Sequence, residues 1–372
     1  MFDGFANFGL DGRLVRACAD AGFAEPFPIQ RRAIAPLLDG RDVIGQAKTG
    51  TGKTAAYALP MLQRLDVEDG SVQALVLAPT RELAIQITEE IRRLGKYMRV
   101  RAATLYGGQP IKQQIDRLKR GVHVVVGTPG RVIDHIKRRT LTLSRVSMVV
   151  IDEADTMLEM GFIDDVEYIL KHTPERKQVA IFSATIPQNI ITLSRKYMRS
   201  PEKILLDWSE PSVEKLRQYY LVHSGGDRLK TLLGVLELER GARCMVFCNT
   251  KVGVRRLSEK LRRLKMDAVA IHGDLSQRER LRAMSRFRDG RARILVATDV
   301  AGRGLDIPSV DCVINYEPPK NPLLYFHRVG RTARAGKAGR SYTIITPEEK
   351  REFSRIRQLT QVEINRIKVE RR

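Results

Sequence analysis

The chain has 372 residues, a hydrophobic content of 43% and a formal net charge of +22, and its length allows two domains with separate cores. No apolar run is as long as a membrane span, and the first residues lack a basic-then-apolar export signal, so we expect a cytoplasmic protein without membrane contact. The excess of positive charge indicates a polyanionic partner, most simply a nucleic acid, with a solvated basic surface as the alternative.

The first predicted element is a short helix over residues 11–22. It is followed by a segment in which Pro26 and Pro28 oppose helix formation, so residues 22–30 are predicted to form an extended turn. Gln30 closes this segment, and its amide can both donate and accept hydrogen bonds. It could therefore read the edge of an adenine, although an isolated Gln is normally a surface residue.

Residues 47–54 read Ala-Lys-Thr-Gly-Thr-Gly-Lys-Thr, after a short apolar strand and before a helix-like run at 55–65. A strand, a glycine loop and a helix in this order form a phosphate-binding loop, whose backbone N–H groups surround phosphate oxygens. Lys53 would reach the β- and γ-phosphates, and the Thr54 hydroxyl would ligate Mg²⁺. The alternative is a Gly/Thr-rich turn, which the Gly-Lys-Thr sequence after an apolar strand disfavours.

Apolar strand-like runs then alternate with helical ones. Continuous apolar strands of this kind indicate a parallel sheet covered by helices on both faces. A polar cluster follows each strand, and ligands bind at the carboxyl ends of such strands, so the clusters are expected to meet at one edge. The predicted strands of this half cover residues 74–77, 102–105, 122–126, 149–151 and 179–182.

Asp152 and Glu153 directly follow one of these strands. A carboxylate there can hold the Mg²⁺ that Thr54 also contacts, and the neighbouring Glu could orient or deprotonate the attacking water. The alternative is an acidic helix N-cap. The phosphate-binding loop earlier in the chain favours the catalytic interpretation.

The alternation breaks at a polar, proline-bearing stretch near residue 207. We therefore predict an N-terminal α/β domain over residues 1–206, a linker over 207–213 and a C-terminal α/β domain over 214–372. The second domain repeats the strand pattern without another glycine loop, and its last stretch, 348–372, is predicted to form an amphipathic helix with a frayed end. Its predicted strands cover 244–248, 268–271, 293–297, 310–315 and 341–345.

The four cysteines, Cys18, Cys244, Cys248 and Cys312, form no C-x-x-C pair. Cys244 and Cys248 would share one face of a strand because strand side chains repeat with a period of two. We expect buried, reduced thiols, with a metal site or disulfide as the weaker alternative.

Arg331 and Arg334 lie in a cation-dense stretch at residues 327–334. Because they are three residues apart, a helical turn would place them on one face. A guanidinium group brought to a γ-phosphate stabilises the charge of the transition state. The alternative is that these arginines are surface groups or contact a nucleic-acid backbone.

In this order, the motifs resemble the core of DEAD-box ATP-dependent RNA helicases over nearly the whole chain. The resemblance implies two tandem RecA-like domains, each a mostly parallel sheet flanked by helices, joined by a short linker. Ala47 agrees with the family pattern, whereas Phe27 stands where the family usually has Thr. The matching motifs lie at 22–30, 47–54, 79–84, 107–108, 128–131, 152–155, 183–185, 246–250, 277–280, 297–306 and 327–334.

The resemblance also implies the functional residues. ATP would be held by Phe5, Phe23, Gln30, Thr49, Gly50, Thr51, Gly52, Lys53, Thr54, Gly304 and Asp306, with Thr54 and Asp152 at Mg²⁺. Catalysis would use Lys53, Asp152, Glu153, Arg331 and Arg334, and Ser183, Thr185 and His327 would couple the ATP and RNA sites. RNA would contact Pro79, Thr80, Arg81, Gly108, Thr128, Arg131, Arg280 and Thr298.

The function implied is RNA-stimulated ATP hydrolysis coupled to local unwinding of short RNA duplexes or remodelling of RNA–protein complexes. An aromatic content of only 6% favours backbone contacts over base stacking, and therefore little sequence preference. Two alternatives stay open, an ATP-gated RNA clamp or scaffold and a DNA helicase or translocase of the same superfamily. Protein partners could supply targeting, and a monomer is expected, with a dimer as the open alternative.

Overall fold

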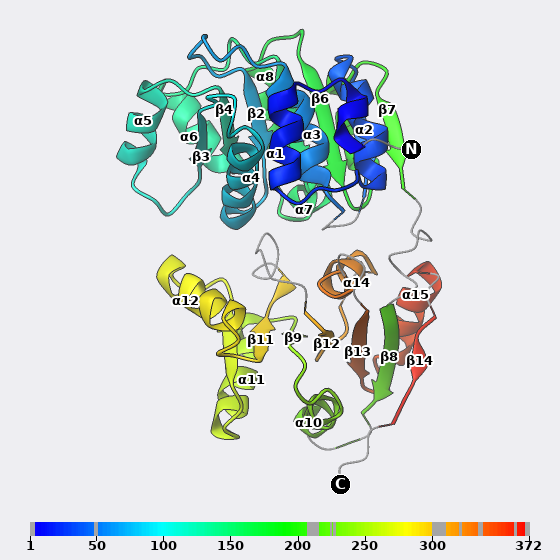
Figure 1. Ribbon diagram of the computed structural model, residues 1–372. Coiled ribbons are helices and arrows are strands. Elements are labelled where there is room, and N and C mark those ends of the chain that lie inside the picture. The colour runs from blue at the N-terminus through cyan, green and yellow to red at the C-terminus, as the bar shows by residue number, and fades with distance from the viewer. Residues whose placement is uncertain are drawn as a thin grey trace. The chain divides into compact units, whose positions relative to one another are not determined.

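The computed structural model describes residues 4–47, 51–206, 216–223, 225, 228–299, 310–319, 322–333, 338–360 and 363–368. The chain divides into two compact units, Met1–Asp207 and Trp208–Arg372, and each unit contains one seven-stranded sheet (Figure 1). The predicted linker at 207–213 lies outside the described residues.

The sheet of the first unit has the strand order β3-β4-β2-β5-β6-β1-β7, and all neighbouring strands pair in parallel. This confirms the parallel sheet predicted from the continuous apolar runs. The edge strand β7 was not predicted, because its sequence Glu-Lys-Ile-Leu has only one buried residue. The strands are β1 (Val43–Gln46), β2 (Ala74–Leu77), β3 (Ala102–Leu105), β4 (Val124–Gly127), β5 (Met148–Asp152), β6 (Gln178–Ser183) and β7 (Glu202–Leu205).

Helices cover both faces of this sheet, and the two faces bury separate apolar clusters. One cluster includes side chains of α1 to α4, and the other includes side chains of α6 to α9. The helices are η1 (Gly4–Phe8), α1 (Gly12–Asp20), α2 (Pro28–Leu38), α3 (Lys53–Gln63), α4 (Arg81–Leu94), α5 (Ile111–Lys119), α6 (Pro129–Lys137), α7 (Ala154–Glu159), α8 (Ile163–Lys171) and α9 (Gln188–Tyr197).

The start of α2 corrects one prediction. Residues 28–30, predicted as part of an extended turn, form the first turn of a helix that begins at Pro28. Proline is compatible with this position because the first helical N–H has no partner within the helix, and its fixed φ suits the helix. Gln30 is therefore presented from a helix and is fully buried.

The second unit has the strand order β10-β11-β9-β12-β13-β8-β14, again with parallel pairing throughout. Helices α10 and α11 pack on one face and α12 on the other, while α14 and α15 share a further cluster with β13. The elements are β8 (Leu216–Val222), α10 (Arg228–Leu238), β9 (Cys244–Phe247), α11 (Lys251–Arg263), β10 (Ala268–Ile271), α12 (Gln277–Arg288), β11 (Ile294–Ala297), β12 (Cys312–Asn315), α14 (Pro322–Val329), β13 (Gly339–Ile345), α15 (Lys350–Thr360) and β14 (Asn365–Arg366).

Two predictions for this unit were wrong. The C-terminal helix ends at Thr360, and the chain then forms β14, which extends the sheet by pairing with β8. A strand of two residues is too short to show the alternation of buried and exposed side chains, so the sequence alone does not predict it. The strand becomes evident from its pairing with β8. In addition, α14 ends at Val329, so Arg331 follows the helix instead of lying on a helical turn; Arg334 is outside the described residues.

The cysteine prediction is confirmed, because all four thiols are free and buried. Burial raises the pKa of Cys18 to about 11 and also raises the pKa values of Cys248 and Cys312. Within the described part of the chain, no set of three or more His, Cys, Asp or Glu side chains could hold a metal ion. No described helix has both the length and the apolar character needed to cross a membrane.

Candidate active site

The phosphate-binding loop leads into α3 through Gly52, which has a left-handed φ of 82°. The Gln30 side chain bridges two backbone segments here: its oxygen accepts from the Phe27 N–H at 2.8 Å, and its Nε2 donates to the Gly52 carbonyl at 3.0 Å. A Cβ atom on residue 52 would overlap the Gln30 amide and lie 2.9 Å from a ring carbon of Phe27. The fold thus joins the predicted adenine-reading Gln to the phosphate loop; Thr49 and Gly50 lie outside the described residues.

Lys53 is the first residue of α3 and is buried, with 7% of its surface exposed. Its ammonium group donates to the Ala47 carbonyl at 3.0 Å and so spans the loop from end to start. A buried lysine at the first turn of the helix that follows a glycine loop is suited to phosphate oxygens.

Asp152 ends β5 and is 2% exposed. The Tyr57 hydroxyl donates to its Oδ2 at 2.9 Å. Burial raises the pKa of Asp152 above its usual range, while the positive charge of Lys53 acts in the opposite direction. Burial and the Asp152 carboxylate together raise the pKa of Tyr57, so its hydroxyl keeps the proton that it donates. Tyr57 is not among the residues predicted from the sequence; it follows Lys53 by four residues, one turn along α3, and this spacing is the available signal.

Glu153 has a left-handed backbone, with φ of 52° and ψ of 50°. For a residue with a Cβ atom this conformation costs of order 1–3 kcal/mol, and such residues cluster at functional sites. Its N–H donates to the Asp152 Oδ1 at 2.9 Å, and the residue is 5% exposed. The turn from β5 into α7 therefore holds the two carboxylates in one defined arrangement.

Asp155 connects this turn to the end of β6. Its N–H donates to the Ser183 hydroxyl at 3.0 Å, and its Oδ2 accepts from the Thr185 N–H at 3.0 Å and from the Thr185 hydroxyl at 3.2 Å. Ser183 is fully buried. Two of the three residues predicted to couple the sites, Ser183 and Thr185, are thus bonded to Asp155, which follows Glu153 by two positions. Asp155 itself was quoted in the motif but was not among the predicted site residues.

The predicted RNA contacts of the first unit gather where β3 and β4 end. Gly108 has a φ of 82°, and a Cβ atom there would overlap the guanidinium group of Arg81. Arg131 donates to the Gln109 carbonyl at 3.2 Å, and the Thr128 N–H donates to the Leu105 carbonyl at 2.9 Å. Thr80, which follows Pro79, caps α4 by accepting from the Leu83 N–H at 3.3 Å.

Phe5 lies in η1 and is 4% exposed. Its ring packs near Phe8 and Phe23, with ring centroids 6.3 and 6.0 Å away. The guanidinium group of Arg93 lies 5.3 Å from the centre of the Phe23 ring. The two aromatic residues predicted to hold ATP, Phe5 and Phe23, therefore form one cluster.

In the second unit, Arg328 on α14 is 1% exposed and joins three strand ends. It donates to both carboxylate oxygens of Asp299 at 2.6 and 2.7 Å, to Asn249 Oδ1 at 2.7 Å and to the Glu317 carbonyl at 2.7 Å. These three partners each lie two residues beyond the end of β11, β9 or β12, which are neighbours in the sheet. Three predicted site residues of this unit are close in sequence to this network. Thr298 precedes Asp299, His327 precedes Arg328, and Arg331, which is 4% exposed, follows α14.

Arg280 lies on α12. Gly304, Asp306 and Arg334 are outside the described residues. The structure thus describes only some of the site residues predicted in the second unit.

The family model of the DEAD/DEAH box helicase matches residues 27–193, and that of the helicase conserved C-terminal domain matches residues 227–336. Over 364 residues the chain is 46% identical to the DEAD-box ATP-dependent RNA helicase CshA of Geobacillus kaustophilus (strain HTA426), covering 98% of this chain and 78% of that protein. The chain belongs to the DEAD-box family of ATP-dependent RNA helicases. Another member, CshA of Bacillus subtilis (strain 168), is 44% identical over 364 residues, with 98% and 74% coverage.

A solved DEAD-box structure agrees with this assignment. S. cerevisiae Dbp5 bound to RNA and ADP BeF3 matches with a TM-score of 0.90 and 32% identity, covering 98% of this chain and 95% of that one. Both the expected fold of tandem RecA-like domains and the family resemblance are therefore confirmed. This DEAD-box chain is an ATP-dependent RNA helicase.

Proposed function

We propose that RNA binding triggers ATP hydrolysis in this helicase, and that the cycle opens short RNA duplexes or remodels RNA–protein complexes. The observation that supports this most is the division of the predicted catalytic set. Lys53, Asp152 and Glu153 belong to the first unit, whereas Arg331 and Arg334 belong to the second. Neither unit alone then has the groups for efficient hydrolysis, so a strand of RNA that binds both can control when ATP is cut.

We propose the following roles at the ATP end. Lys53 binds the β- and γ-phosphates, Gln30 and Phe5 hold adenine, and Glu153 orients the attacking water and accepts its proton. Arg331 and Arg334 stabilise the charge that develops on the γ-phosphoryl group.

The residues present also fit Mg²⁺. Thr54 offers a hydroxyl oxygen and Asp152 a carboxylate oxygen, and Mg²⁺ prefers such hard oxygen ligands together with phosphate oxygens. The hydrogen bonds from Tyr57 and from the Glu153 N–H fix the carboxylate, as groups behind a metal ligand commonly do. When bound, Mg²⁺ neutralises charge on the β- and γ-phosphates.

The RNA would lie against the backbone-binding groups of both units. Arg81, Gly108, Thr128 and Arg131 meet at one sheet edge of the first unit, and we propose that they bind sugar and phosphate groups. We propose that the hydrogen bonds of Asp155 with Ser183 and Thr185 couple RNA binding to the catalytic pair Asp152 and Glu153. We further propose a monomer acting in the cytoplasm, with protein partners selecting its RNA.

The test is ATP turnover by the full chain with no nucleic acid, with single-stranded RNA and with a DNA strand of the same sequence. We expect RNA to raise turnover steeply and DNA to have little effect. Equal turnover with and without RNA contradicts the coupling, and equal stimulation by DNA favours the translocase alternative. The rate of ATP turnover is then compared with the rate of RNA dissociation. RNA that dissociates within the time of one turnover favours unwinding, whereas RNA that stays bound through many turnovers favours the clamp.

Phe27 provides a second prediction, on nucleotide affinity. Its ring is 41% exposed and lies beside Gly52, while Gln30 is bonded to the Gly52 carbonyl. The ring thereby stabilises a loop arrangement in which the Gln30 amide is engaged by the protein. Replacing Phe27 with Thr removes that apolar contact, and we expect the KM for ATP to fall about threefold, the equivalent of a few tenths to 1 kcal/mol of apolar burial.

The same substitution should also stabilise α2 by about 1 kcal/mol, because Thr can cap the helix where Phe cannot. Phe27→Leu is the matched control, since it is apolar and cannot cap. Steady-state kinetics and thermal melting of the three proteins check both effects. A KM that is unchanged or higher in Phe27→Thr would show that the ring does not hold the loop.

A further inference from the structure

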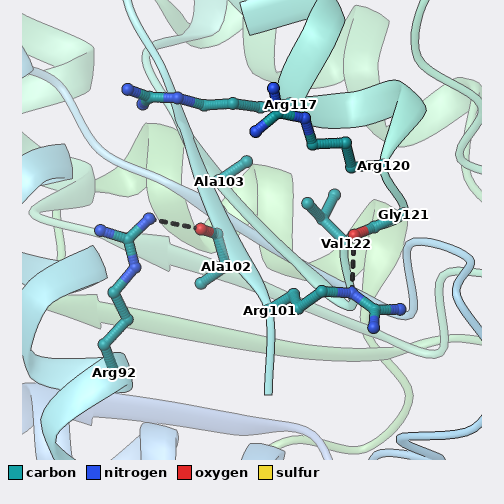
Figure 2. Close-up of a pocket in the computed structure, with 8 residues that line it drawn as sticks. All are labelled: Arg92, Arg101, Ala102, Ala103, Arg117, Arg120, Gly121 and Val122. Atoms are coloured by element: carbon teal, nitrogen blue, oxygen red, sulfur yellow. Dashed lines mark hydrogen bonds between the residues drawn. The ribbon is translucent and has the colours of Figure 1, made fainter. Parts of the chain in front are cut away.

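A cavity of about 360 Å³ in the first unit is lined by four arginines, Arg92, Arg101, Arg117 and Arg120 (Figure 2). Arg92 comes from α4, Arg101 from the residue before β3, and the other two from the end of α5. Small residues such as Ala102 and Gly121 form part of the lining and leave room for a ligand. None of these residues belongs to the predicted ATP or RNA sites.

The cavity lies at the opposite end of the strands from the predicted RNA contacts. Ala102 is the first residue of β3 and Gly121 precedes β4, whereas Gly108 and Thr128 follow the last residues of the same two strands. Because a strand rises about 3.3 Å per residue, the four residues of β3 alone separate the cavity from the predicted RNA contacts by roughly 10–13 Å. A nucleic-acid strand of ordinary length can contact both places.

Two of the arginines are held in place by backbone carbonyls. Arg92 donates to the Ala102 carbonyl at 2.6 Å, and Arg101 donates through Nε to the Gly121 carbonyl at 2.8 Å (Figure 2). These bonds use only part of each guanidinium, which carries five donors. Arg101 Nη2 also lies 3.2 Å from His123 Nε2, so both arginine planes are pre-positioned, and each guanidinium keeps further N–H groups for a ligand.

The positive charge of the cavity has no direct ion-pair partner in the described part of the protein. Among the described residues, no carboxylate forms an ion pair with any of the four arginines, although other basic side chains of this unit, such as Arg138 and Lys196, do pair with acids. The C-terminal end of α5 favours cations and accounts for Arg117 and Arg120 alone. It does not explain why Arg92 and Arg101 from other elements face the same space. A bound anion would relieve the mutual repulsion of the four charges.

The chemistry favours phosphate groups. Planar guanidinium forks bind phosphate oxygens in pairs, and the cavity has no aromatic side chain on which a base could stack. We propose that this arginine cavity binds the sugar–phosphate backbone of the RNA strand beyond the stretch held at the carboxyl ends of β3 and β4. The proposal rests on the proposed RNA-coupled function and adds a second anchoring point that lengthens the RNA footprint.

The test compares Arg117→Gln/Arg120→Gln with Lys112→Gln/Lys119→Gln, a control that removes the same charge from exposed positions within α5 without altering the cavity lining. Binding is measured with single strands of about 6 and about 20 nucleotides, lengths that span the range of typical binding sites. For the long strand, we expect the arginine variant to bind about tenfold more weakly than the control, with a salt-dependence slope smaller by about 1.4. The short strand should bind both variants equally.

The proposal is overturned if both variants lose the same affinity for the long strand, because general charge would then explain the effect. It is also overturned if the arginine variant binds the long strand as the control does, and an acidic protein partner then becomes the better explanation of the cavity. Thermal melting confirms that each variant is folded. ATP turnover stimulated by the short strand is a separate readout of the proposed function, so its loss and the loss of the cavity proposal can be told apart.

Discussion

Replacing Glu153 with Gln should lower RNA-stimulated ATP turnover by about 10²–10⁴-fold, the contribution of a positioned general base. Gln keeps the shape of the side chain but cannot take a proton from water. Since Lys53 and Asp152 stay in place, ATP should still bind, and RNA binding in the presence of ATP should persist. Turnover assays and direct nucleotide-binding measurements on the same preparation check the two halves of this result.

A second substitution separates chemistry from backbone strain. Gly at position 153 lacks the carboxylate but tolerates φ of 52°. We therefore expect Glu153→Gly to be inactive, with a free energy of unfolding about 1 kcal/mol higher than that of the native protein. Glu159→Gln, at the exposed end of α7, is the control for a change of charge nearby. Substantial turnover by Glu153→Gln would exclude Glu153 as the base.

Removing the buried guanidinium of Arg328 should have the largest effect on stability. Arg328→Met leaves the Asp299 carboxylate without its bidentate partner, and breaking a buried ion pair in this way costs about 3–5 kcal/mol. The loss should be confined to the second unit, because all three of these bonding partners belong to it. Hydrogen exchange is the suitable measurement, since a two-unit chain does not unfold as one cooperative system.

The amides expected to lose protection are those of β9, β11 and β12, whose following segments Arg328 connects. Arg328→Lys keeps the charge and cannot reproduce the fork, so its effect should be intermediate. The double variant Arg328→Met/Asp299→Leu should recover much of the loss, because it removes both charges. Unchanged exchange in Arg328→Met would contradict a stabilising role for this network.

Structural features that depend only on residues close together in the sequence were predictable. The four-residue apolar runs at β2 and β10 have the bounds predicted for them, because a strand buried on both faces is apolar at every position. The phosphate-binding loop and the Asp152–Glu153 pair were also recognisable, since their chemistry requires particular residues at short spacing. The start of α2 at Pro28 was not predicted, because the two prolines suggested an extended turn. A helix accepts proline in its first turn, where the missing N–H costs no hydrogen bond.

The sequence by itself determined the type of sheet, the presence of a nucleotide site and, through its motifs, the family. Tertiary structure decided which distant residues support one another. Tyr57 meets Asp152 across 95 positions, and Arg328 reaches Asn249 across 79, because the order of strands in the sheet brings these ends together. The same reason applies to the arginine cavity, whose members come from α4, α5 and the start of β3. Local periodicity contains no information on strand order, so such contacts become visible only when the sheets are assembled.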